Sequence, residues 1–85
     1  MRITRHIDPG HSWFEVKRSV IADLKLLDKI SGYSYQKGGM VYLEEDCDAD
    51  IVLSALEANH VYIIFDNMQT NRESWVRDCD RFINN

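Results

Sequence analysis

Five carboxylates stand within residues 44–50 of the stretch VYLEEDCDAD, which makes divalent-cation binding the first chemistry to consider. Four acids occupy the first, third, fifth and twelfth positions of a calcium-loop spacing: Asp46, Asp48, Asp50 and Glu57. A calcium loop requires glycine at its sixth position for a sharp turn, but Ile51 stands there. It also requires an entering helix, whereas the residues before Asp46 have the pattern of a strand. The sequence therefore leaves a divalent-cation or small-ligand binding domain as an alternative function, and it assigns no metal ligand.

The same acids suit the start of a helix. The side chain of Asp46 or Asp48 is expected to accept hydrogen bonds from the first N–H groups of that helix. Neighbouring carboxylates complement the positive end of the helix dipole. Glu44 and Glu45 are not needed for this role, so they remain candidates for an acidic docking surface.

Residue types that bind zinc are present without a zinc-binding spacing. His6, His11, Cys47 and Cys79 form no CxxC or HxxxH pair, so the sequence does not predict a zinc site. Carboxylates surround Cys47 in the sequence and oppose its thiolate form, so we expect an ordinary thiol there.

The residues contain no catalytic motif. There is no GxSxG turn, and Gly38 and Gly39 lead into an expected strand, where a phosphate-binding loop leads into a helix. His11 and Glu15 lie on one face of an expected strand, and a shallow pocket around them is the remaining enzymatic interpretation. We therefore expect a non-enzymatic protein without a cofactor.

Hydrophobic spacing predicts the elements that position these residues. Strands are expected at residues 2–7 and 12–16, joined by an Asp-Pro-Gly turn. A helix is expected over residues 17–30, where apolar side chains recur at helical spacing: Val20, Ile21, Leu24, Leu27 and Ile30. Residues 33–36 and 40–43 then form a β-hairpin around Gly38 and Gly39, which are both free to adopt positive φ.

The second half of the chain is expected to contain a helix, a strand and another helix. The first helix follows the acidic run and ends near residues 59–60. Residues 61–65 form an almost unbroken apolar run, typical of a central strand that is covered on both faces. A capping-box spacing at residues 70–73 precedes the apolar face of the second helix: Trp75, Val76, Cys79, Phe82 and Ile83.

The element order ββαββαβα predicts one α+β domain over residues 1–85, built as a two-layer sandwich. When the first strand is set aside, the remaining order contains a ferredoxin-like βαββαβ core followed by the last helix, which is one interpretation of the fold.

The expected hairpin places its aromatic side chains on one face. Tyr35 lies opposite Tyr42, and Tyr33 and Met40 share the same face. Helices cover only one sheet face in a two-layer domain, so these tyrosines either bind a partner or complete a core. We take partner binding as the leading prediction, with six residues assigned to it: Tyr33, Tyr35, Tyr42, Glu44, Glu45 and Asp48.

Charge is distributed unevenly along the 85-residue chain, whose formal net charge is −4. No basic residue lies between Lys37 and Arg72, while seven acidic residues do. A negative field of this kind steers a basic protein partner and repels nucleic acid, so direct nucleic-acid binding is not expected. A mimic of double-stranded DNA would need all these acids on one side. A homodimer through the tyrosine face is a further alternative.

Export and membrane signals are missing from the sequence. No apolar run approaches the ~20 residues that span a bilayer, and residues 1–8 lack a signal-peptide core. The chain has two cysteines, and without an export signal we expect reduced thiols, a cytoplasmic location and no membrane partner.

Two stretches resemble small uncharacterised proteins encoded by bacteriophages and other mobile elements. They are HSWFEV at residues 11–16, and DKISGYSYQK at residues 28–37 running on into VYLEEDCDAD at residues 41–50. The resemblance covers roughly residues 8–58, and the similar sequences carry a proline where Lys17 stands. It implies a phage-type accessory protein that binds a host or phage protein in the host cytoplasm.

Overall fold

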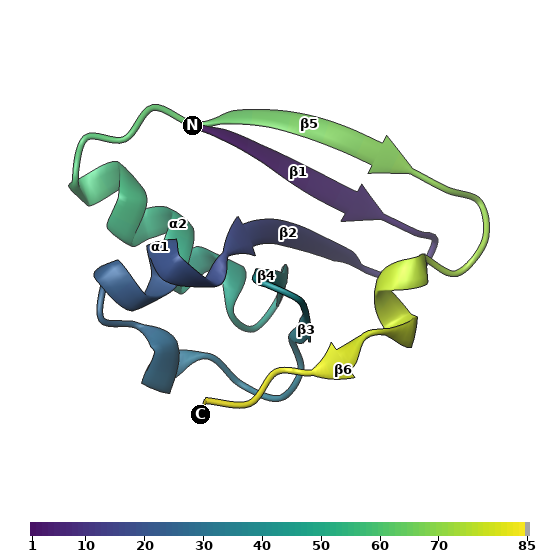
Figure 1. Cartoon of the computed structure of the whole chain (residues 1–85). Coiled ribbons are helices and arrows are strands. Elements are labelled where there is room, and N and C mark those ends of the chain that lie inside the picture. The colour runs from purple at the N-terminus through teal and green to yellow at the C-terminus, as the bar shows by residue number, and fades with distance from the viewer. Residues whose placement is uncertain (85) are drawn as a thin grey trace.

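The computed structural model describes residues 1–84, which form one six-stranded sheet with two α-helices (Figure 1). The strand order across the sheet is β5-β1-β2-β4-β3-β6. The strands are β1 (Arg2–Ile7), β2 (Ser12–Lys17), β3 (Tyr35–Lys37), β4 (Met40–Glu44), β5 (Ile64–Gln69) and β6 (Asp80–Arg81). The helices are α1 (Arg18–Asp23) and α2 (Ala49–Ala58), with 3₁₀ turns η1 (Leu27–Lys29) and η2 (Trp75–Asp78). The expected α+β class is confirmed.

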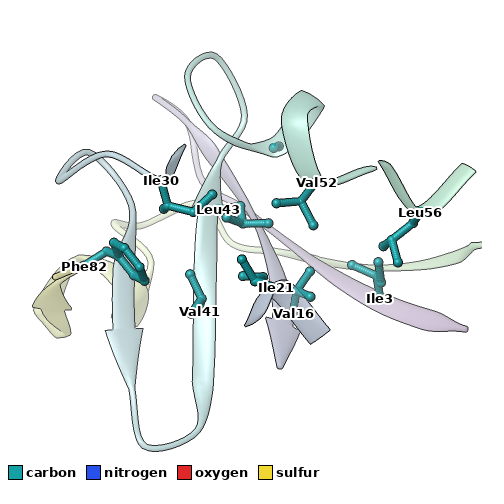
Figure 2. Close-up of a cluster of buried hydrophobic side chains, with 10 residues drawn as sticks. Ile3, Val16, Ile21, Ile30, Val41, Leu43, Val52, Leu56 and Phe82 are labelled. Atoms are coloured by element: carbon teal, nitrogen blue, oxygen red, sulfur yellow. The ribbon is translucent and has the colours of Figure 1, made fainter. Parts of the chain in front are cut away.

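Both helices pack against the same face of the sheet. Ile21 of α1 and Val52 and Leu56 of α2 share one buried cluster with Val16 of β2 and Leu43 of β4 (Figure 2). Alternation along the strands sends these sheet side chains to one side, so the helices bury an apolar layer and leave the opposite sheet face to be covered by other means.

The sheet contains part of the expected ferredoxin-like arrangement. β4 lies between β2 and β3 and pairs antiparallel with both, while α1 lies on the connection from β2 to β3. This is a split βαβ unit. On the other side, β1 is inserted between β2 and β5 and pairs parallel with β5 (Figure 1). The first strand of the chain is therefore an interior strand of the sheet.

The prediction of a central strand at residues 61–65 is wrong. The strand begins later, as β5, and it is an edge strand whose six residues are all exposed. Val61 and Ile63 instead pack against the helix-side cluster as part of the connection from α2. Tyr62, Ile64 and Phe65 are exposed, so the run is not covered on both faces.

The two helices predicted at residues 17–30 and after residue 74 are also different in the structure. The first is broken at Lys25, whose φ of 60° ends α1 and leads into η1. The second is replaced by η2, followed by β6, which pairs with β3. This extended path lets Val76 bury itself on one sheet face and Phe82 on the other, which a continuous helix on one face would not allow.

The β3–β4 turn gives a first test of the hairpin. Gly38 has a φ of +59°, whereas Gly39 has no positive φ, and a Cβ at either position meets nothing within 4 Å. We expect Gly38→Ala to lower the free energy of unfolding by about 1 kcal/mol, because a side chain is strained at positive φ. Gly39→Ala should be neutral or stabilise by up to about 1 kcal/mol. Urea unfolding checks both, and equal losses would contradict the turn geometry.

Candidate functional site

The C-terminal segment covers the sheet face that the helices leave open. Tyr35 and Tyr42 pair across the hairpin as predicted, but they are only 8% and 4% exposed. They form a buried cluster with Trp13 and Val76, and the ring of Trp75 contacts Tyr42 edge-on at 5.3 Å. The expectation of an open tyrosine face is therefore wrong for these two residues. Tyr33 alone among the assigned tyrosines is exposed, at 66%.

The three acids assigned to a docking edge do not form one exposed surface. Glu44 and Asp48 are buried. Glu45 lies 3.0 Å from Arg5 and accepts a hydrogen bond from the hydroxyl of Ser12. The Ser12 hydrogen bond, with a smaller contribution from Arg5, lowers the pKa of Glu45. These carboxylates are engaged within the fold, so the predicted acidic edge is largely absent.

Asp48 stands at the N-cap position of α2, but its side chain makes no capping hydrogen bond within the described chain. It turns to the loop before β3, where it accepts from the backbone N–H of Ser31 and from the hydroxyls of Ser31 (2.7 Å) and Ser34 (2.6 Å). The prediction of a capping role is therefore wrong for Asp48. The buried carboxylate instead joins the start of α2 to the hairpin.

The structure also separates the four acids with calcium-loop spacing. Asp48 is directed to the serines, and Asp50 accepts from the Ser54 hydroxyl on the surface of α2 at 3.1 Å. Asp46 belongs to a different cluster, with His11 and Glu44. A loop-type calcium site is therefore not formed by these residues.

His11 and Glu15, the enzymatic interpretation, do not share a pocket. Glu15 pairs with the buried His6, whose Nε2 lies 2.9 Å from the Glu15 carboxylate. Tyr42 and Trp75 contact the His6 ring at centroid distances of 5.6 and 5.2 Å. Burial, with the charge of Glu15, raises the pKa of Tyr42 to about 12. The paired side chains of His6 and Glu15 therefore belong to the packing around Tyr42 and Trp75, next to the buried cluster that contains Trp13 and Val76.

The structure instead brings His11 to Glu44 and Asp46. Nδ1 of His11 lies 3.2 Å from Oε1 of Glu44, and one ligand-type atom from each of the three residues lies within 4.8 Å of the others. Oε2 of Glu44 accepts from the backbone N–H of Asp46 at 2.9 Å, which fixes the carboxylate. The loop that carries His11 is held by Asp8, which accepts from the His11 N–H at 2.9 Å.

This cluster opens into a pocket of about 300 Å³ on the tyrosine side of the sheet. Arg77 lies over the Trp13 ring at 5.1 Å and Arg81 over the Tyr35 ring at 4.7 Å, and all four residues line the pocket. Two buried polar atoms of its lining, Nε1 of Trp13 and Oε1 of Glu44, have no hydrogen-bond partner among residues 1–84. The pocket therefore offers an unused donor and a carboxylate oxygen that receives no hydrogen bond and lies 3.2 Å from Nδ1 of His11.

Sequence reasoning named Glu44 and His11 but did not bring them together. Their proximity depends on the pairing of β2 with β4, which places Trp13 opposite Glu44. Those strands are separated in sequence by α1 and β3, and no local signal specifies that they are neighbours.

Neither cysteine is set up as a nucleophile. Hydrogen bonding to Glu44 raises the pKa of the Cys47 thiol, and burial raises that of Cys79. Both are free thiols. Because a raised pKa favours the protonated form, we expect low reactivity at neutral pH.

Comparison with known proteins adds no family. No family model, no curated protein and no solved structure matches the chain. Within residues 1–84, no helix combines the length and the apolar character that crossing a membrane requires.

Proposed function

We propose that this chain is a non-enzymatic, phage-type accessory domain that binds a protein partner by strand addition at the free edge of β5. The phage setting and the cytoplasmic location rest on the resemblance of residues 11–16 and 28–50 to small phage and mobile-element proteins. The proposed binding surface is the β5 edge of the sheet. It replaces the tyrosine face expected from the sequence, because Tyr35 and Tyr42 are buried.

The observation that carries this proposal is the unprotected edge of β5. All six residues are exposed, and Ile64, Phe65 and Met68 are large and apolar. Natural edge strands are commonly blocked by lysine, proline or a bulge, and β5 contains neither lysine nor proline. Its single charged side chain, Asp66, forms a surface salt bridge with Arg2 at 2.7 Å.

Backbone geometry identifies the groups that a partner strand would use. The N–H group of Ile64 donates to the carbonyl of Met1, just before β1, and that of Thr70 donates to the carbonyl of Ile7, the last residue of β1. Because N–H and C=O groups alternate in direction along a strand, those of Phe65, Asn67 and Gln69 point away from β1. An extended peptide can pair with these three residues while its side chains contact Phe65 or Met68.

The test uses one substitution that blocks strand addition and one that does not. Asn67→Pro removes an outward N–H without touching the bonds to β1, and proline is tolerated on edge strands. Asn67→Ala keeps that N–H and is the matched control. Tagged wild-type chain should capture the same bacterial protein as Asn67→Ala, and Asn67→Pro should lose it by at least tenfold, with all three chains melting at similar temperatures.

Two results would contradict the strand-addition mode. One is a partner retained equally by Asn67→Pro. The other is a partner that is lost only as salt rises, which would indicate steering by acidic side chains instead. If the purified chain forms a dimer that Asn67→Pro converts to monomer, the partner is a second copy of the chain, joined through the same edge.

A further inference from the structure

We propose that His11, Glu44 and Asp46 form a binding site for a divalent transition-metal ion, with zinc as the best match to the ligand types. The site is independent of the β5 edge. It lies at the mouth of the tyrosine-side pocket, where the loop between β1 and β2 meets the end of β4.

The buried carboxylate of Glu44 is the first observation that points to a cation. Its side chain is 9% exposed, and its Oε1 has no hydrogen-bond partner in the described part of the chain. A buried acceptor that receives no hydrogen bond is destabilising, so binding of a group that satisfies it is favoured. Oε1 is directed toward His11, which is the more exposed member of the pair.

The spacing of the atoms is the second observation. Nδ1 of His11 and Oε1 of Glu44 are 3.2 Å apart, which is ion-pair distance, but the contact lacks hydrogen-bond geometry. Two ligands bound tetrahedrally to zinc at about 2.0–2.1 Å are roughly 3.3 Å apart, so this separation suits two ligands of one ion. The Asp46 carboxylate lies within 4.8 Å of both other ligand atoms, and it is exposed.

The ligand types select the class of metal. Imidazole nitrogen and carboxylate oxygen are both zinc ligands, and three protein ligands leave one position of a tetrahedral ion open. Calcium instead takes six to eight oxygen ligands, and this cluster supplies only two carboxylates. Here the open position would face the pocket, where the unpartnered Nε1 of Trp13 can donate to a water or to another bound ligand.

The two arginines that line the pocket are bonded to groups other than the proposed metal ligands. Arg77 is paired with Asp8 at 2.7 Å, and Arg81 donates to the Gly32 carbonyl at 3.3 Å while it lies over Tyr35. The Glu44 and Asp46 carboxylates have no basic side chain of Lys or Arg bonded to them among residues 1–84. Glu44 contacts His11, which is itself a proposed ligand, and the Cys47 thiol, which is neutral when protonated, so no fixed positive charge opposes a cation at these carboxylates.

Isothermal titration of the reduced chain with zinc chloride tests the proposal. We expect one zinc ion per chain and at least tenfold weaker binding in each of two variants, His11→Gln and Asp46→Asn. Both positions are exposed, so these variants should fold normally. Asp50→Asn and Glu57→Gln, which remove exposed carboxylates from α2, are matched controls and should bind zinc as wild type does.

Site-specific readouts complete the test. The ring resonances of His11 should shift at one equivalent of zinc, and the melting temperature should rise in wild type but not in His11→Gln. Magnesium or calcium at the same concentration should produce neither effect. The proposal is overturned if wild type binds no zinc, or if His11→Gln and Asp46→Asn bind it as tightly as the controls do.

Discussion

Replacing Asp8 with asparagine is expected to lower the free energy of unfolding by about 3 kcal/mol, corresponding to a fall in melting temperature of about 12–24 °C. The Asp8 side chain is 1% exposed and receives the guanidinium of Arg77 at 2.7 Å. It also accepts from the backbone N–H groups of Gly10, His11 and Ser74. Asparagine retains an acceptor oxygen but leaves Arg77 without a counter-charge. The expected loss of stability is at the lower end of the range for broken buried ion pairs, because the Arg77 side chain is partly exposed and can be hydrated in the variant.

The pH dependence of stability provides a second measurement of the same interaction. The hydrogen bond from Arg77, which outweighs the opposing effect of burial, holds the pKa of Asp8 well below its usual range. A carboxyl whose pKa is lower in the folded chain stabilises it fully above its unfolded pKa of about 3.9. That stabilisation is lost as the pH falls from there toward the folded pKa. The difference between wild type and Asp8→Asn should therefore be constant near neutral pH and shrink in acid.

Asp78→Asn is the control for this prediction. Asp78 is exposed and lies next to Arg77 in the sequence, so the same chemical change should alter stability by less than about 0.5 kcal/mol. Chemical denaturation of the three chains at several pH values makes the comparison. Equal stability of wild type and Asp8→Asn would mean that the ion pair does not anchor the C-terminal segment.

Replacing Asp48 with alanine is expected to cost a similar amount, about 3 kcal/mol. The substitution leaves the Ser31 N–H and the Ser34 hydroxyl without their acceptor, and Ser34 is fully buried. Each buried donor that loses its partner costs about 1–3 kcal/mol. Asp50→Ala, two residues further along and exposed, should change stability by no more than about 0.5 kcal/mol.

A double-mutant cycle separates this network from packing. Asp48→Ala, Ser34→Ala and the double variant should show a coupling energy of about 1–3 kcal/mol, because the two side chains share one hydrogen bond. Additive losses would show that Asp48 stabilises the fold through contacts other than Ser34.

Local features of the fold were predictable because their causes lie within a few residues. The β3–β4 hairpin follows from two glycines between β-type stretches, and the pairing of Tyr35 with Tyr42 follows from that turn. The α2 helix follows from its apolar spacing. The α+β class follows from the alternation of these elements.

Features that depend on distant parts of the chain were not predictable. The run at residues 61–65 was apolar enough for a central strand, and only its pairing with β1 shows that β5 lies at an edge. The helical spacing of Val76 and Phe82 was misleading, because the chain passes around the sheet between them. The burial of Tyr42 and the meeting of His11 with Glu44 depend on the same long-range arrangement.

The path of the C-terminal segment has a consequence for synthesis. Trp13, Tyr35 and Tyr42 are covered by a segment that leaves the ribosome long after they do. Because chains emerge N-terminal first, the helix-side layer can begin to assemble while this second layer still faces solvent. Until residues 74–82 arrive, the nascent chain exposes these aromatic side chains to solvent, and premature termination before Val76 would leave them uncovered.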